Sequence, residues 1–442
     1  MFSMFINAFK VKDIRKKLLF TFMCLLVVRL GSLIAVPGLA SGAIENFTLT
    51  LKDLDFLNAM LGGSLSNLSI FALNISPYIT ASIIMQLLTI AIPKLAEMQQ
   101  DGESGRKKIA SISRYLTIAL SLIESTAMAI GFSNSGYTVD SKALTIILII
   151  ASFTAGSAFL MWLGENITEY GVGNGISIIL LINIVSQMPQ SFTNLFQKFV
   201  TGESIKPVYR VIAALIIAAV VIATTVLIVA LQDAERKIAV QYSKKVVGRK
   251  MVGGNSTFIP LKVNTGGVIP VIFAVSIYQF PIIISSFFGV TGERTTFWRK
   301  VLYMCSTSHW FNISSFGEFK YTLGAVFYVI MIIFFAYFYT SVTFNPMEVA
   351  NNMKKNGGFI PGIRPGKPTT DYLNHVLTYI VLIGAVLLSV VALIPIIFCG
   401  VFNASVSFGG TSLIIVAGVI LETMKQIEAQ LLNRHYKGFL ND

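Results

Sequence analysis

Long apolar stretches constrain the fold of this chain more than any other feature of its sequence. A helix needs about 20 mostly apolar residues to cross the hydrocarbon core of a bilayer. The chain has 442 residues, of which 54% are hydrophobic and only 12% charged, whereas soluble domains carry about 25% charged residues. We therefore predict an all-α polytopic membrane protein with ten transmembrane helices, at residues 18–37, 74–92, 114–132, 143–163, 174–190, 208–231, 268–290, 322–343, 373–399 and 409–429.

The distribution of Lys and Arg predicts how these helices are oriented, because cytoplasmic loops are enriched in both residues. With the N-terminus inside, 24 of the 34 Lys and Arg residues fall in inside segments and 9 in outside segments, while Arg29 lies within the first stretch. That first stretch follows basic residues but leads to no small-residue cleavage pattern, so we expect it to be retained. Both termini are predicted to be cytoplasmic.

The ten stretches divide into two halves of five. The N-terminal half would comprise residues 1–190 and the C-terminal half residues 208–442, with an outside hinge linker at 191–207. An odd number of spans per half would give the halves opposite orientations, as in inverted-repeat transport proteins. Two inside loops, 232–266 and 344–372, are longer and more basic than a connection needs. These loops either anchor the topology or bind a partner.

The sequence contains no recognisable motif for catalysis or metal binding. It has no HExxH, no CxxC pair and no P-loop, and its three His residues lie far apart. The glycine-rich stretch 171–175 joins two predicted spans rather than a strand and a helix, so it predicts no dinucleotide site. We therefore expect no enzymatic activity, no cofactor and no metal.

Ionisable residues within membrane spans often mark ion or proton pathways. The candidates here are Arg29, Glu124 and Glu422. For each of them, burial in a helix–helix contact or extension to the membrane surface is the alternative explanation. A cation-coupled transporter would need more polar groups near the middle of the membrane.

The segment between the first two spans, residues 58–70, is rich in Gly, Ser and Asn but also carries apolar side chains. It is too short to cross a bilayer and too apolar for a simple solvent-exposed loop. A re-entrant half-helix inside a protein cavity satisfies both conditions. An interfacial helix is the alternative.

Pairs of branched apolar residues four positions apart occur at the start of two spans. Ile75 and Ile79 form one pair, and Ile176 and Leu180 form the other. Residues four apart lie on one face of a helix. Such a face is usually a packing surface, so the spacing alone does not predict a pore.

Several longer strings resemble one protein family. Residues 69–88, which read SIFALNISPYITASIIMQLL, are similar to the second-span signature of the SecY family of bacterial protein-translocation channels. The resemblance implies a clamshell of two inverted five-helix halves around an hourglass pore. Its function would be to pass unfolded secretory polypeptides across the membrane and to release apolar segments sideways into the lipid. Further similar strings follow in the family's order at residues 102–108, 168–177, 260–270, 344–346, 358–366 and 425–430.

The same resemblance implies roles for particular residues. The pore ring would consist of Ile75, Ile79, Ile176, Leu180, Ile272 and Ile415. The plug below it would be the segment 58–70, including Asn58, Leu61, Gly62, Gly63, Ser64, Leu65 and Leu68. The lateral gate between the second and seventh spans would include Thr80, Ser82, Gln86, Ile269, Phe273 and Gln279. Docking of SecA or the ribosome would involve Arg236, Lys237, Lys244, Lys245, Arg249 and Arg364.

The partners that the resemblance implies are the small subunits SecE and SecG, the ATPase SecA, the ribosome, polypeptides with signal sequences, and membrane lipid. The resemblance implies a location in the bacterial plasma membrane. It implies no small-molecule substrate. Two features depart from the family pattern: Asn74 replaces a usual glycine, and the outside loop 291–320 follows no familiar pattern. A secondary transporter and a structural assembly or insertion factor are the alternative functions.

Overall fold

The computed structural model describes residues 9–40, 61–134, 136–139, 143–199, 207–242, 245–247, 250–252, 256–287, 311–312, 320–321, 323–402 and 410–438. Each of the ten predicted spans corresponds to a helix in this part of the chain. These helices are α2 (Lys12–Gly31), α5 (Ser76–Ala91), α7 (Gly102–Asn134), α8 (Ala143–Tyr170), α9 (Gly175–Phe199), α10 (Pro207–Asp233), α11 (Ile269–Phe287), α13 (Leu323–Thr343), α15 (Lys367–Phe402) and α16 (Gly410–Gly438).

Length and apolar composition make the chain a multi-pass membrane protein. Among the described residues, six helices are long and apolar enough to cross a bilayer on their own. A seventh span results if α5 and the short helix α6 (Pro93–Gln100), which are bent by 107° at their junction, are taken together. Pro93 explains the break, because proline disfavours helical backbone in the residue before it.

Some boundaries differ from the predicted ones. The first helix ends at Gly31 rather than at residue 37, because the chain beyond it pairs with the segment before α5: Ile70 N donates to Ile34 O, and Val36 N donates to Leu68 O, each at 3.0 Å. Helix α9 continues through Pro189 to Phe199, so the predicted linker 191–207 begins as helix. Its residues 200–206, like most of the outside loop 291–320, lie outside the described residues.

The helices of the two halves have the same pattern of neighbours. In the first half, α2 contacts α8 and α9, α5 contacts α7, and α8 contacts α7 and α9. In the second half, α10 contacts α15 and α16, α11 contacts α13, and α15 contacts α13 and α16. When the five helices of each half are numbered in chain order, the same pairs are in contact in both halves. Two repeats of one five-helix unit would give this result.

The halves meet along two seams. On one side of the bundle α11 contacts α5 and α7, and we call this the α5–α11 seam. On the other side α9 contacts α10 and α16, and this is the α9–α16 seam. The short chain between α9 and α10 belongs to the second seam, so the α5–α11 seam is the one that no short connection crosses.

The two basic loops form a β-sheet that the sequence analysis did not predict. Strand β1 (Glu235–Tyr242) pairs antiparallel with β4 (Ser256–Lys262) from the same loop and with β7 (Gly358–Phe359) from the other. Ile238 and Val240 on β1 point into an apolar core shared with α14 (Pro346–Lys355) and α15, whereas their neighbours along the strand are exposed. Two further strand pairs are β2 (Lys245–Val247) with β3 (Lys250–Val252), and β5 (Phe311–Asn312) with β6 (Lys320–Tyr321).

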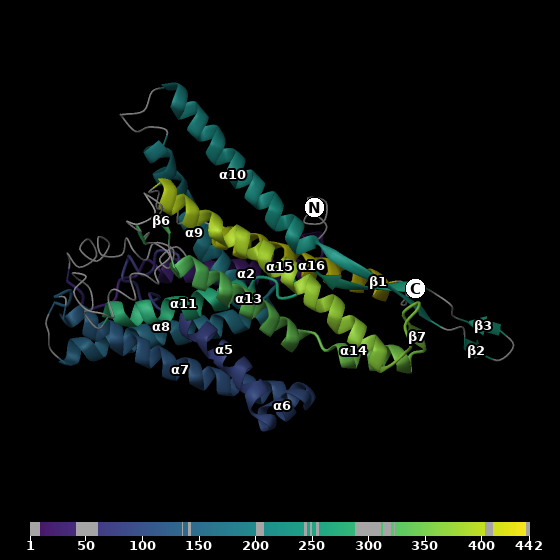
Figure 1. Cartoon of the computed structure of the whole chain (residues 1–442). Helices are drawn as coiled ribbons and strands as arrows, with labels where there is room; N and C mark the ends of the chain where they lie inside the picture. Colours follow the sequence, from purple (N-terminus) through teal and green to yellow (C-terminus); the bar gives the residue numbers. More distant parts are fainter. Residues whose placement is uncertain are drawn as a thin grey trace.

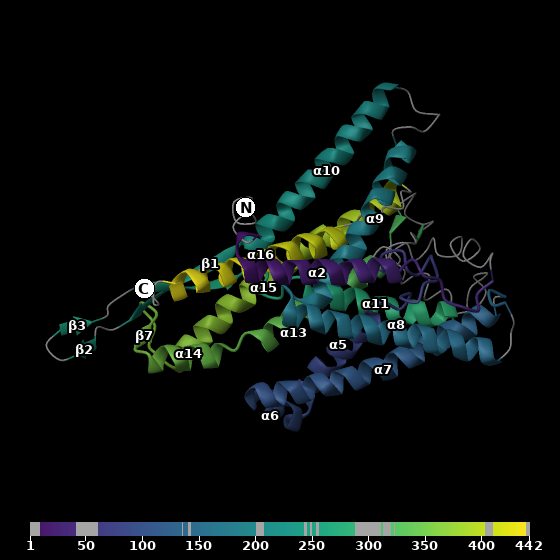
Figure 2. The same cartoon turned by 180° about the vertical axis from the view of Figure 1, so that it is seen from behind.

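The sheet and α14 extend from one end of the bundle, and the start of α2 and the last turns of α16 lie toward the same end (Figures 1 and 2). Ile14 of α2, Val172 between α8 and α9, and Ile427 of α16 form one buried cluster there. An ion pair of 2.8 Å joins Lys425 Nζ of α16 to Asp233 Oδ1 at the end of α10. Segments predicted to be cytoplasmic therefore gather at a single end, which we call the sheet end.

The segment 61–70 consists of turns and contains no helix, so the predicted half-helix is wrong for the residues that the structure describes. Gly62, Gly63 and Leu68 have φ angles of 69°, 77° and 45°, which a right-handed helix does not allow. Ser64 Oγ donates to Leu61 O at 2.6 Å and Ser69 Oγ donates to Ser64 O at 3.1 Å. Short polar side chains that bond to nearby carbonyls stabilise such turns.

Thr21 supplies a testable link between distant parts of the first half. Its Oγ1 accepts a hydrogen bond of 3.1 Å from the buried Val172 N. Thr21→Val keeps the shape but leaves that N–H unpaired, which should lower the free energy of unfolding by about 1–3 kcal/mol. Thermal unfolding of the purified protein in detergent would measure the loss.

Thr126→Val is the matched control, because Thr126 is half-buried and its Oγ1 donates within its own helix, to Leu122 O. An equal fall in the unfolding midpoint for both variants would contradict the role of Thr21.

Candidate functional site

The six predicted ring residues come from both halves of the chain and are brought together in one apolar cluster. They lie at the start of α5, on α9, on α11 and on α16. Ile75, Ile79, Leu180, Ile272 and Ile415 are each at most 7% exposed and belong to the cluster, and the partly buried Ile176 packs against it. Spacing alone favoured ordinary packing for these residues. The structure adds that the packing joins four helices across both seams.

Local bonds orient two of the ring positions. Asn174 precedes α9, and its Oδ1 accepts from Ile176 N and Ser177 N at 3.1 and 3.3 Å. Asparagine is a favoured residue at this position of a helix start. At the start of α5, Asn74 Oδ1 accepts from Ile75 N at 2.9 Å.

A cavity of about 420 Å³ lies next to the cluster on the side of the sheet end. Ile272 of the ring contributes to its wall, and polar and charged residues form much of the remainder. The cavity would hold water, because several polar groups converge on it. Its polar lining includes Asn174, Ser177, Gln232, Lys262, Asn264, Thr265, Glu422, Lys425 and Gln426.

The segment 61–70 lies on the other side of the same cluster. Leu61, Leu65 and Leu68 are buried in a second apolar cluster with the far end of α7 and the start of α8, and Ile70 packs against both clusters. Gly156 of α8 lies so close to Ile70 O that a Cβ there would clash with this carbonyl. Asn58 of the predicted plug lies outside the described residues.

A charged group from α2 and an amide group from the turn before α5 hold this segment. Arg29 Nη1 of α2 donates to Gly62 O at 3.2 Å. Asn74 Nδ2 donates to Leu61 O at 3.3 Å. Sequence analysis left Arg29 open between helix packing and an ion pathway, and it missed the role of Asn74. The residue type of Asn74 could have indicated an unusual backbone conformation, because asparagine is enriched among non-glycine residues with positive φ. Its φ angle is 51°.

The predicted gate residues lie on α5 and α11, the two helices that form the α5–α11 seam. On α5, Thr80 Oγ1 donates to Ser76 O at 3.1 Å, and Gln86 Nε2 donates to Ser82 Oγ at 3.4 Å. The buried Gln86 Oε1 has no hydrogen-bond partner in the described part of the chain.

On α11, Ile269 is partly buried, and the ring of Phe273 packs edge to face against Phe335 and Tyr339 of α13. The side chain of Gln279 is outside the described residues.

The predicted docking residues lie at the sheet end where the structure describes them. Arg236 and Lys237 on β1 and Arg364 after β7 are all exposed. The sheet places β1 beside β7, so it brings the two basic loops into one surface. Lys245 starts β2, whereas Lys244 and Arg249 lie outside the described residues.

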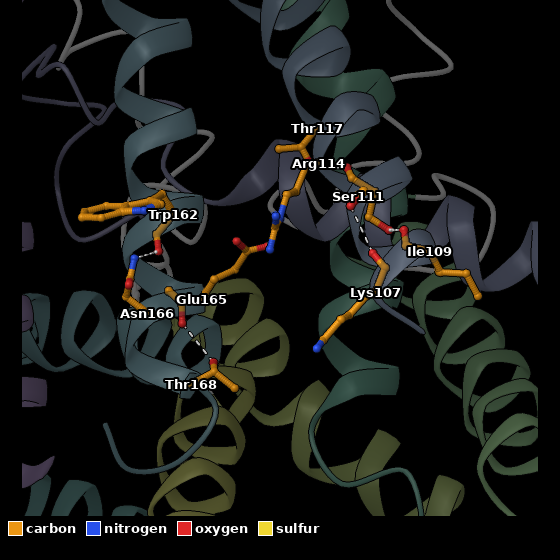
Figure 3. Close-up of polar contacts among 11 residues, drawn as sticks. Lys107, Ile109, Ser111, Arg114, Thr117, Trp162, Glu165, Asn166 and Thr168 are labelled. Carbon is orange, nitrogen blue, oxygen red and sulfur yellow. Dashed lines mark hydrogen bonds and ion pairs between the residues drawn. The ribbon is translucent and has the colours of Figure 1, made fainter. Parts of the chain in front are cut away.

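A separate ion pair joins helices α7 and α8 of the first half. Arg114 of α7 points toward Glu165 of α8, with 2.8 Å between Nε and Oε1 (Figure 3). Both side chains are partly exposed, so this pair contributes modestly to stability. No group of three or more His, Cys, Asp or Glu residues that could hold a metal ion occurs among the described residues.

Comparison with known proteins identifies the family. The family model for SecY matches residues 69–424. The protein translocase subunit SecY of Halalkalibacterium halodurans is 42% identical over 445 residues, covering 100% of both chains.

Among solved structures, a protein-conducting channel has a TM-score of 0.65 and 18% identity, covering 94% of this chain and 92% of its own. Sec61 in a canine ribosome–channel complex has a TM-score of 0.61 and 18% identity, with the same coverage. The chain therefore belongs to the SecY family of translocase subunits, and it is a protein-conducting channel rather than an enzyme.

Proposed function

We propose that this channel passes unfolded secretory polypeptides across the bacterial plasma membrane through the ring of six aliphatic residues and releases transmembrane segments sideways into the bilayer. The observation that carries the proposal is the ring itself. Residues from both halves of the chain meet in one buried apolar cluster that has a polar cavity on one side and the segment 61–70 on the other.

An apolar constriction suits this task for two reasons. A narrow ring of branched aliphatic side chains excludes water and therefore blocks ions. Dispersion contacts are also non-directional and individually weak, so the ring discriminates little between the side chains of a passing polypeptide. The polar cavity beside Ile272 would keep such a chain hydrated before it enters the ring.

The segment 61–70 would act as a plug when no polypeptide is present. Two observations support this role. The segment is buried beneath the ring, and its turns are anchored through a few hydrogen bonds. A segment held by few bonds can leave without unfolding a helix.

The α5–α11 seam would be the lateral exit. Two features support it: the chain connects the halves closely only at the α9–α16 seam, and α5, which forms one side of the α5–α11 seam, carries the polar side chains of Gln86 and Ser82. A buried Gln86 Oε1 without a partner weakens the closed packing, because an unpaired buried acceptor costs free energy.

The sheet end would face the cytoplasm, with both termini on that side, and would bind SecA or a translating ribosome. Exposed Arg236, Lys237 and Arg364 support this proposal, since such residues contact acidic protein surfaces or RNA phosphates. The similarity to a channel from a ribosome complex supports the ribosome as a partner. SecE and SecG would complete the membrane complex, and polypeptides with signal sequences would enter it.

Reconstitution tests the proposal as a whole. The chain, combined with SecE and SecG in vesicles of bacterial phospholipid, should protect a secretory precursor from protease when SecA and ATP are added. A secondary transporter would instead take up solutes without protecting the precursor, and an assembly factor would do neither. Either of these results would refute the proposed function.

The ring predicts a leak when it becomes polar. Ile79→Asn combined with Ile272→Asn should raise the resting ion conductance severalfold, because amide groups hold water in a constriction that otherwise excludes it. Precursors with weak signal sequences should also be translocated more readily. Planar bilayer recordings would measure the conductance.

The matched control is Ile79→Leu combined with Ile272→Leu, which keeps the volume and the apolar character of both positions. If the Asn variant conducts no more than the Leu variant, the assignment of these residues to the ring is wrong.

Arg364 gives a test of partner docking. Arg364→Glu should reduce SecA-driven translocation at least severalfold, because it replaces an attractive charge by a repulsive one, while membrane insertion of the channel remains normal. Protease protection of a precursor measures the first effect and membrane fractionation the second.

Lys107→Glu makes the same charge change on an exposed residue of α7, away from the sheet. Normal translocation by the Arg364 variant, or an equal defect in both variants, would argue against docking at this position.

A further inference from the structure

Two neighbouring carbonyl groups of the segment 61–70 are held by side chains from different elements, helix α2 and the turn before α5. Leu61 O accepts from Asn74 Nδ2 at 3.3 Å, and Gly62 O accepts from Arg29 Nη1 at 3.2 Å. Leu61 O also accepts from Ser64 Oγ within the segment, but the Arg29 and Asn74 bonds come from outside it. Arg29 lies in the last turn of α2, and Asn74 is buried.

Asn74 connects the segment to the pore ring. Its side chain is a bridge: Nδ2 binds Leu61 O, and Oδ1 accepts from the backbone N of Ile75, which belongs to the ring. The residue is 2% exposed and has a positive φ of 51°. Its backbone therefore sits in a conformation that few residues accept, and its amide reaches both partners only from this position.

We propose that Arg29 and Asn74 form a latch that holds the segment 61–70 in its closed position, and that movement of Ile75 opens it. The inference rests on the proposed function of the segment as a plug. When the ring widens, the start of α5 moves with Ile75. Asn74 then moves away from Leu61 O, because it is bonded to Ile75 and adjacent to it in the chain. Arg29 and Asn74 are positioning residues in this account, since neither needs to touch the polypeptide.

Asn183 of α9 provides an acceptor for Arg29 once the segment leaves. It is 1% exposed, and neither its Oδ1 nor its Nδ2 has a hydrogen-bond partner among the described residues. Asn183 Oδ1 and Arg29 Nη1 lie 2.8 and 2.9 Å from the point where a Cβ on Gly62 would stand. Both groups therefore lie beside Gly62. Departure of the segment would free Arg29 to donate to Asn183, which would reduce the cost of leaving a partly buried charge without a partner.

The test is the resting conductance of the full chain, reconstituted with SecE in planar bilayers. Asn74→Gly removes the bridge without backbone strain, because glycine accepts positive φ. It should raise the resting conductance about fivefold, the change that corresponds to the loss of one hydrogen bond. Arg29→Gln removes a charged donor and should raise it about tenfold.

Two matched controls make the same changes elsewhere. Asn134→Gly lies at the exposed end of α7, and Arg106→Gln lies on an exposed turn of the same helix. Both should conduct as the unmodified protein does. Translocation of a precursor with an intact signal sequence by the Asn74 and Arg29 variants would show that they fold.

Deletion of residues 61–67 separates the latch from the plug. The deletion should raise the conductance, and Asn74→Gly should add nothing to it if Asn74 acts through the segment. If Asn74→Gly instead loosens the ring in general, it should raise the conductance further in the deletion variant, and this result would overturn the latch.

The remaining outcomes are also distinct. If the deletion opens the channel but the Asn74 and Arg29 variants match their controls, the latch is wrong and the plug remains. If the deletion leaves the conductance unchanged, the proposed plug itself fails, and the latch fails with it.

Discussion

Apolar packing between the two halves of the chain is the interaction on which the rest of this structure depends. Ile75 and Ile79 of the first half meet Ile272 and Ile415 of the second in one buried cluster. When the proposed ring widens, these side chains would meet water from the adjacent polar cavity, so the burial of apolar surface stabilises the closed ring. Close packing adds dispersion contacts, which are lost gradually as the halves separate and re-form without any bond having to find its partner.

Two bonds between segments that are distant in the sequence each lie within one half of the chain. Thr21 binds Val172 within the first half, and Lys425 binds Asp233 within the second. The α5–α11 seam lacks an ion pair among the residues that the structure describes. This division would let each half move as a unit if the proposed lateral exit opens at this seam.

The helices could be predicted from the sequence because about 20 apolar residues have few alternatives in a membrane. Three features could not. The half-helix at 61–70 was wrong because Gly62, Gly63 and Leu68 adopt positive φ angles that depend on tertiary contacts. Strand β4 carries Pro260 and exposed polar residues, so its strand character comes from pairing with β1 rather than from propensity. The ring required knowledge of which helix faces meet, and spacing along one helix does not contain that information.

The β-sheet at the sheet end has a mechanical consequence. Its strands come from the loops on either side of α11 and α13, so all of them belong to the second half of the chain. A motor protein or ribosome seated on this sheet would grip that half alone. A force applied there would rotate the second half relative to the first. The resulting strain would fall on the α5–α11 seam, which no short connection crosses.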